Sequence, residues 1–243
     1  MKKRKKSSKI KIISKVLMFI LFVGIVTYSV FPSEMTKREW EFYSRSYGVT
    51  LGLTLGGGLI GITLGTFLAY LRFQKVRVVE FIIDEYIDIM RGTPMVLQLL
   101  IFSVVVFATW TNNFYVAIIT LGLNSAAYVA EIVRSGIESI DKGQMEAARA
   151  IGMPYSMAMN EIVLPQAIKN ILPALVNEFI TLFKETSIVG YISVMDVTMN
   201  SKSLQATYYS PRPILFTGII YYVSVKVFSL LSKMLEGKLK AND

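Results

Sequence analysis

Polar and ionisable side chains lie inside the most apolar stretches of this sequence, where a charge is costly to place and therefore marks a candidate functional residue. These residues are Gln98, Asn124, Tyr128, Glu131, Asn177, Glu178, Lys184, Glu185, Thr186, Ser187 and Lys226. The sequence has no cysteine and no histidine, which excludes thiol nucleophiles, histidine bases, disulfides and Cys/His metal sites. No nucleophile paired with a base is visible. We therefore expect these side chains to recognise charge without bond chemistry, and we expect no metal and no cofactor.

The elements that hold these residues are long apolar segments. The chain has 243 residues, of which 53% are hydrophobic and only 18% charged, whereas a soluble domain carries roughly 25% charged residues. A membrane span needs about 20 mainly apolar residues. The stretches that qualify are residues 16–31, 47–71, 94–110, 114–132, 172–194 and 214–235. The sequence thus predicts an all-α membrane protein with about six transmembrane helices.

The first apolar stretch follows a strongly basic segment, residues 2–15, and this is also how a cleavable signal peptide begins. Against cleavage, the apolar run is long for a signal peptide and ends at Phe31 and Pro32 without an A-x-A-like site. We expect a retained anchor helix, while the sequence alone leaves cleavage open.

Lysine and arginine are distributed unevenly over the predicted loops. With the N-terminus inside, nineteen of them lie in inner segments and five in outer segments, while Lys184 and Lys226 lie within spans. This asymmetry is what the positive-inside rule predicts for a protein with both termini in the cytoplasm. The net charge of +9 therefore orients the chain, and the expected partner of the basic N-terminus is anionic lipid of the inner leaflet, not nucleic acid.

Two predicted inner segments have helical patterns. Residues 134–170 form the only long loop, and loops of that length are usually functional. In residues 76–90, Glu80, Asp84 and Asp88 recur every four positions. We expect that segment to be an amphipathic helix at the inner membrane surface, with its carboxylates opposite Val79, Ile82, Ile83 and Tyr86. An acidic vestibule for a substrate is the alternative.

Glycines recur every four residues in the second apolar stretch, in two rows. The rows are Gly48, Gly52 and Gly56, and Gly57, Gly61 and Gly65. Such rows let helix backbones approach closely in lipid, so we expect a packing face. A phosphate loop is not expected, because no G-K-[ST] follows and no strand precedes the glycines.

The long inner loop carries a motif with fixed spacing. The motif consists of Glu146, Ala147, Ala148, Gly152, Ile162, Leu164 and Pro165. It resembles the EAA signature, EAA-x3-G-x9-I-x-LP, of permease subunits in ABC-type importers. Flanking segments resemble the polar amino acid branch of that family, the relatives of histidine, arginine and glutamine importers. These segments are residues 91–94, 126–134, 142–144, 164–167 and 184–188, and the similarity runs from about Thr50 to Glu236.

The resemblance implies a type I importer permease of a prokaryotic cell membrane, with a five-helix core to which the first span adds an anchor. Residues 1–46 would then form the N-terminus, anchor and external linker, residues 47–237 the permease domain with the EAA loop at about 136–170, and residues 238–243 a tail. The resemblance also implies a second permease subunit, identical or paralogous, two cytoplasmic ATPase subunits and an external solute-binding protein. Another cargo, such as an opine or a sulfur amino acid, and an ATP-independent channel are the alternatives.

The EAA segment also has a mechanical interpretation from its residues. Glu146, Ala147 and Ala148 favour a short exposed helix that fits a groove on a partner. Gly152 suits a left-handed helix end, and Pro154 fits the stop that follows. We expect a second short helix from about Tyr155. A solvated amphipathic loop is the plainer alternative, and the resemblance favours a coupling helix docked on an ATPase. Glu146 would either pair with an arginine of that partner or cap its own helix.

Depth along the spans sorts the polar candidates. Asn124 falls near the middle of its span and Tyr128 one turn further inward on the same face. Glu131 lies nearer the cytoplasm, where it faces a vestibule or bonds Arg134. The resemblance places Lys184, Glu185, Thr186 and Ser187 along the translocation path or the dimer interface. Asn177 lies near them in the same span. Alternatively, Lys184 and Glu185 neutralise each other across the dimer. Gln98 is a further candidate for the substrate path. Lys226 is expected to have a structural role and to extend its side chain toward Lys233.

Overall fold

The fold is helical throughout the part of the chain that this computed structural model describes, which is the backbone of residues 2–240 and the side chains of residues 14, 17–234 and 237. The α-helices are α1 Lys2–Val30, α2 Lys37–Phe73, α3 Arg77–Gly92, α4 Met95–Ile101, α5 Asn113–Glu138, α6 Lys142–Ala150, α7 Tyr155–Ala158, α8 Leu164–Glu185, α9 Val197–Tyr208 and α10 Arg212–Lys240. Two π-helices, η1 Phe102–Val106 and η2 Met159–Val163, and a 3-10 helix, η3 Thr186–Ile192, continue α4, α7 and α8. The prediction of an all-α membrane protein is confirmed.

Three of the predicted spans are single helices that are long and apolar enough to cross a membrane, α2, α5 and α10. They correspond to the stretches 47–71, 114–132 and 214–235. In α1 the apolar part of the helix covers Leu17–Val30, which is shorter than a full span.

The predicted span at 94–110 is only part of a broken span. It forms α4 and η1, which meet α3 at an angle of 109°. Only α3 together with α4 and η1 is long and apolar enough to cross a membrane. The break falls at Thr93 and Pro94, where the backbone becomes extended. This follows from Pro94, because proline disfavours the helical conformation of the residue before it. The segment expected to lie apart at the inner surface is thus joined to the span.

The predicted span at 172–194 differs at both ends. The helix starts earlier, at Leu164, and its α-helical part stops at Glu185. At that point the hydroxyl of Thr186 donates a 2.7 Å hydrogen bond to the carbonyl of Phe183. A threonine hydroxyl that bonds a nearby carbonyl competes with regular helix geometry, and the chain continues as the tighter η3.

The helix α3 has one apolar face packed on the bundle and further apolar side chains that are exposed. Ile83, Ile87 and Met90 are buried against α5 and α2, while Ile82 is 60% exposed. The placement of Ile82 and the other exposed apolar side chains at a membrane surface stays a prediction.

The glycine row Gly57, Gly61 and Gly65 of α2 packs directly on α5. A Cβ atom on Gly61 would lie 2.6 Å from Ser125 Oγ, and one on Gly65 would lie 2.6 Å from the carbonyl oxygen of Ala126. The other row is looser, since a Cβ on Gly48 would meet nothing within 4 Å. The packing role is confirmed for the row that ends at Gly65, and the α2–α5 contact is the largest between any two helices described.

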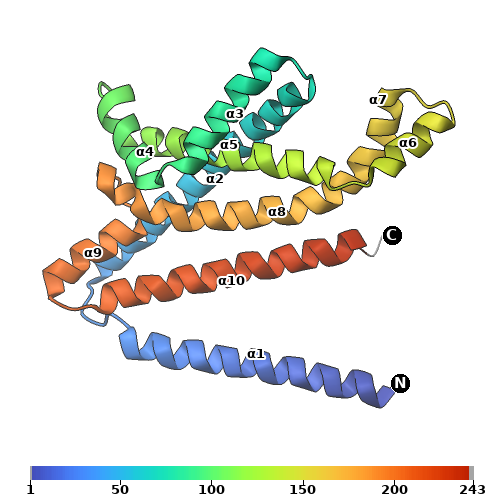
Figure 1. The fold of residues 1–243 in the computed structure, drawn as a ribbon. Helices are drawn as coiled ribbons and strands as arrows, with labels where there is room; N and C mark the ends of the chain where they lie inside the picture. Colours follow the sequence, from blue (N-terminus) through green and yellow to red (C-terminus); the bar gives the residue numbers. More distant parts are fainter. Residues whose placement is uncertain (1, 241–243) are drawn as a thin grey trace.

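The helices place the EAA segment at one end of the molecule. In Figure 1, α6 and α7 lie at the right, together with the start of α1 and the end of α10. The connection from α1 to α2 and the helix α9 lie at the opposite end. The segments predicted to be inner and those predicted to be outer thus lie at opposite ends of the molecule, as the distribution of lysine and arginine requires. The basic side chains of residues 2–11 and 15, and those of Lys238 and Lys240, lie outside the described residues, and so does their predicted contact with lipid.

Candidate functional site

The first half of the EAA segment forms the short helix α6. Asp141 caps it by accepting a 2.7 Å hydrogen bond from the backbone N–H of Gly143. Glu146 and Ala147 are exposed, and Ala148 is buried. Because Asp141 already serves as the cap, the alternative in which Glu146 caps its own helix is wrong, and its carboxylate faces solvent.

Gly152 ends α6 in the left-handed conformation, with a φ of 90°. Its N–H donates to the carbonyl of Arg149 at 3.1 Å, and the N–H of Met153 donates to the carbonyl of Ala148 at 3.1 Å. These two bonds define a Schellman helix end, which satisfies carbonyls that would otherwise lack a donor. The Arg149 guanidinium donates to the Met153 carbonyl at 2.7 Å. The predicted helix stop at Gly152 is confirmed.

The second helix begins at Tyr155, as predicted, but it is not a separate element. It passes through η2 into α8 without leaving helical geometry. Within η2 the N–H of Leu164 donates to the carbonyl of Met159, and the side-chain amide of Gln166 donates to the carbonyl of Ile162 at 2.8 Å. Pro165 has no N–H to give, which explains why the α-helical bonding is interrupted here. Residues 155–185 therefore form one continuous helical rod.

Three large apolar side chains surround the Gly152 turn and are exposed, which the sequence analysis missed. They are Ile151 at 79%, Tyr155 at 56% and Met157 at 44% exposure. Together with Glu146 and Ala147 they form what we call the lever tip. The sequence does not single them out, because the same loop has other apolar residues such as Met145, Met153 and Met159.

Gln98 and Asn124 are buried and bonded to each other, not to a cavity. The Asn124 amide donates to Gln98 Oε1 and to the carbonyl of Met90, both at 3.0 Å. The Gln98 amide donates to the Met90 carbonyl at 2.7 Å and to Thr93 Oγ1 at 2.8 Å. These bonds satisfy the backbone at the α3–α4 break, where lipid offers no partner. Both path candidates thus hold the broken span together.

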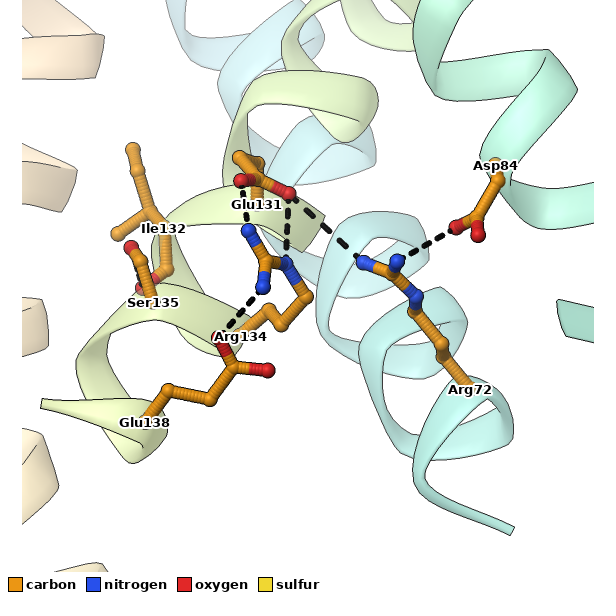
Figure 2. A network of polar contacts seen from close by, with 7 residues as sticks. All are labelled: Arg72, Asp84, Glu131, Ile132, Arg134, Ser135 and Glu138. Carbon is orange, nitrogen blue, oxygen red and sulfur yellow. Dashed lines mark hydrogen bonds and ion pairs between the residues drawn. The ribbon is translucent and has the colours of Figure 1, made fainter. Parts of the chain in front are cut away.

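Glu131 belongs to a network of ion pairs that joins α2, α3 and α5 (Figure 2). It accepts two hydrogen bonds from Arg134, one of them from Nε at 2.9 Å. Arg72 lies between this carboxylate, at 3.8 Å, and that of Asp84, at 2.9 Å. Arg134 also pairs with Glu138. Of the two expectations for Glu131, the structure shows the bond to Arg134. Asp84 pairs with Arg72.

Tyr128 lies one turn from this network, beneath a cation. The guanidinium carbon of Arg91 lies 5.3 Å from the centre of the Tyr128 ring, within the range of a cation–π contact. Arg91 is exposed, and Tyr128 is half-buried. Arg91 was recognised only as part of a motif, and the contact with Tyr128 is a tertiary one that the spacing does not predict.

The polar residues of α8 are divided between two faces. Asn177 and Lys184 are exposed, and Thr181, which the sequence analysis missed, lies exposed between them. The spacing of four and three residues puts all three on one side of the helix. Glu178 lies on another face and accepts a 2.8 Å hydrogen bond from Ser125 of α5.

Thr186, Ser187 and Lys226 lie away from that exposed face. Thr186 is fully buried, and Ser187 is half-buried. The Lys226 Nζ lies 5.5 Å from the centre of the Tyr222 ring. Tyr222 precedes Lys226 by about one turn, so the side chain extends in the direction opposite to Lys233. The expected extension toward Lys233 is therefore wrong in direction, because helical side chains tilt toward the helix N-terminus.

A helical membrane protein with a short exposed helix and turn at one end, and with polar residues within its long helices, has the architecture of a transport protein. Residues 61–241 match the family described as binding-protein-dependent transport system inner membrane component, and the chain belongs to this family. It is 43% identical over 212 residues to the arginine transport system permease protein ArtQ of Bacillus subtilis, covering 86% of this chain and 97% of that protein.

Other relatives give the same picture. A putative glutamine transport system permease protein GlnP of Rickettsia typhi is 37% identical, over 80% of this chain and 91% of its own length. Among solved structures, an amino acid ABC transporter with histidines matches with a TM-score of 0.78 and 37% identity, over 84% of this chain and all of the other. The MetNI methionine ABC transporter matches with a TM-score of 0.70 at 19% identity, which supports the fold alone.

Proposed function

We propose that this chain is the permease subunit of an ATP-driven importer for a polar amino acid, and that ATP is hydrolysed on a separate subunit. Two permeases that resemble it, at 43% and 37% identity, are named for arginine and glutamine transport. A nopaline permease of Agrobacterium fabrum is 34% identical, so an opine remains the second candidate cargo. The sulfur amino acid alternative has only the fold-level likeness to MetNI.

The observation that carries the coupling mechanism is the continuous rod of residues 155–185 hinged at Gly152. Exposed apolar side chains at one end of the molecule fit a groove on a protein partner. When two ATPase subunits close around ATP, a tip bound to them moves with them, and the rod carries that displacement into α8. The chain itself makes no bond; the energy enters through differential contacts with the partner in its two states.

The exposed face of α8 is the proposed lining of the transport path. Asn177, Thr181 and Lys184 are exposed, and if α8 crosses the membrane, as we propose, polar groups that face lipid are expensive. A second permease subunit, identical or paralogous, would cover this face and create a polar path between the two. Lys184 would then provide a cation for the carboxylate of the cargo.

The assembly requires an external solute-binding protein at the end opposite the lever tip. In the proposed orientation both termini and the lever tip lie in the cytoplasm. We further propose the division into residues 1–46, 47–237 and 238–243, with α1 retained. Contacts of the segment after α1 with the core support retention: Arg212 pairs with Glu34 at 2.7 Å, and the Phe31 and Phe216 rings lie 5.8 Å apart.

Reconstitution tests this function. The chain is placed in proteoliposomes with its ATPase subunits, its binding protein and radiolabelled arginine, glutamine, nopaline or methionine. We expect uptake of one polar amino acid that requires ATP and the binding protein and that stimulates ATP hydrolysis. Uptake without ATP would identify a channel, and selective uptake of nopaline or methionine would replace the proposed cargo.

A further inference from the structure

The loop that joins α9 to α10 is held at both ends by the segment that follows α1. The hydroxyl of Tyr208, the last residue of α9, donates a 2.6 Å hydrogen bond to Glu39 Oε2. The guanidinium of Arg212, the first residue of α10, pairs with Glu34 at 2.7 Å. Oε2 of Glu39 also accepts a 2.7 Å hydrogen bond from the backbone N–H of Thr36. Residues 209–211 therefore lie between two polar contacts that fix both ends of the loop.

Tyr209 lies within this loop in an unusual conformation. Its backbone is in the left-handed region, with a φ of 48°, which is unfavourable for a residue with a Cβ atom. The residue is 96% exposed, so its ring does not contribute to the core. Such strain persists only where the surroundings impose it, and it is concentrated at functional sites. The fixed loop thus presents an aromatic ring to the surroundings of the protein.

The helix α9 that precedes the loop is firmly attached to the bundle by buried polar groups. Asp196 caps the helix by accepting hydrogen bonds from the backbone N–H groups of Thr198, at 3.0 Å, and Met199, at 2.8 Å. The Asn200 amide donates to Ser46 of α2 at 3.1 Å, and Asp196 and Asn200 are buried. Because these bonds fix one side of α9, the exposed side is preorganised for contact with a partner.

A hollow of about 460 Å³ lies beside Tyr209 and along the exposed side of α9. It is lined by Lys202, Gln205, Ala206, Tyr209, Ser210 and Pro211, and we call it the Tyr209 hollow. Lys202 is exposed, and within the described residues no carboxylate forms an ion pair with it. The hollow thus combines a cation that lacks an internal partner with an exposed tyrosine ring. A carboxylate of another protein, beside an apolar side chain, matches both.

The position of the Tyr209 hollow indicates which protein this is. In Figure 1, α9 and the loop to α10 lie at the end of the molecule opposite α6 and α7. In the function proposed above, that end faces the solute-binding protein. Tyrosine is among the residue types that carry most of the binding energy in protein interfaces, and charges around such an interface speed association.

We propose that the Tyr209 hollow is a docking site for the solute-binding protein, in which an acidic side chain of that protein pairs with Lys202 and an apolar one packs on the Tyr209 ring. The inference rests on the proposed function, from which it takes the partner and the orientation of the chain. The contacts of Glu39 with Tyr208 and of Glu34 with Arg212 hold the loop in its docking conformation. The segment after α1 thereby has a role in docking.

The test is binding of the solute-binding protein by the full-length chain in complex with its ATPase and permease partners. The complex is kept in detergent without added phospholipid, and the dissociation constant, Kd, is measured by interferometry at low and at high salt. ATP hydrolysis by the same complex is followed as the binding protein is titrated. We expect binding that weakens with salt, and ATP hydrolysis that the binding protein stimulates.

Two variants with matched controls make the test specific. Lys202→Glu should raise Kd about tenfold at low salt, because like charges then face each other, and this difference should shrink at high salt. Tyr209→Asn should raise Kd about tenfold at both salt concentrations, since asparagine accepts the left-handed conformation and only the ring is lost. Lys37→Glu, at another exposed lysine, and Tyr28→Asn, at an 87% exposed residue of α1, should bind like the parent.

An unchanged Kd in either Lys202→Glu or Tyr209→Asn, with normal stimulation of ATP hydrolysis in the parent, would overturn the docking site and leave the proposed function intact. Equal weakening in the two controls would also overturn it, because the effect would not be specific to the hollow. A Lys202→Glu effect that appears only after phosphatidylglycerol is added would assign the hollow to lipid instead. A parent complex that the binding protein does not stimulate would contradict both the docking site and the proposed function.

Discussion

Asn124 donates a 3.0 Å hydrogen bond to Gln98 across the junction of α5 and α4, and both side chains are buried. Because their amides also bond the Met90 carbonyl, the pair maintains the 109° bend between α3 and α4. A polar pair that was expected to contact cargo is thus occupied with the backbone of a broken span.

Gln98→Leu should therefore lower the stability of the folded protein. The change removes the bonds that Gln98 gives to the Met90 carbonyl and to the Thr93 hydroxyl, and it leaves one buried N–H of the Asn124 amide without an acceptor. An unsatisfied buried group of this kind costs about 1–3 kcal/mol. Thermal unfolding of the detergent-solubilised protein measures this loss. Thr63→Val is the control, since its hydroxyl bonds only the carbonyls of its own helix at an exposed position. Equal melting of the two variants would show that the pair does not stabilise the bend.

Gly152→Val should abolish uptake while the protein still inserts in the membrane. A left-handed conformation costs a residue with a Cβ atom about 1–2 kcal/mol, and the β-branched valine tolerates it least. Gly152→Asn adds a side chain of similar size that accepts this conformation more readily, and it should retain much of the transport. The measurement is uptake normalised to the amount of inserted protein. If both variants transport equally well, the hinge conformation is not needed for coupling.

Glu131→Gln should weaken transport of all cargoes to the same degree. In the structure its carboxylate bonds Arg134 and lies near Arg72, so its loss disturbs the ion network and not a cargo contact. The ions are partly exposed, and solvent screening limits the stability loss to about 1 kcal/mol. Apparent KM values for arginine and glutamine provide the measurement. A KM increase for arginine alone would instead assign Glu131 to cargo binding.

Lys184→Gln should reduce uptake about tenfold, the loss expected when a charged hydrogen-bond donor to a carboxylate is removed. Lys226→Gln is the matched control, because Lys226 contacts Tyr222 on α10 and not the exposed face of α8. Initial uptake rates in proteoliposomes distinguish the two. Equal losses, or a loss confined to Lys226→Gln, would move the proposed path away from α8.

The sequence predicts the parts of this fold that local chemistry decides. Long apolar runs produced α2, α5 and α10, and the requirement for a positive φ fixed the end of α6 at Gly152. The start of the next helix at Tyr155 followed from Pro154. In each case the relevant residues are neighbours in the chain, so the local sequence alone predicts the helix or its end.

The features that the sequence does not predict depend on contacts between distant segments. Ile83 and Ile87, and not the neighbouring Ile82, pack on α5 and α2, and this choice depends on where those helices lie. Gln98 and Asn124 are separated by 26 positions, and their bond arises only when α4 and α5 meet. Without knowledge of these contacts, a buried amide that holds backbone cannot be distinguished from one that binds cargo.

The location of the lever tip tests the account most directly. The chain has no cysteine, so Ser156→Cys, exposed on α7, and Ser203→Cys, exposed on α9, each supply a single thiol near opposite ends of the molecule. With a membrane-impermeant maleimide on intact cells, we predict labelling of Ser203→Cys alone, and in inverted vesicles labelling of Ser156→Cys alone. Labelling of Ser156→Cys from outside intact cells would contradict the transfer of force from a cytoplasmic ATPase.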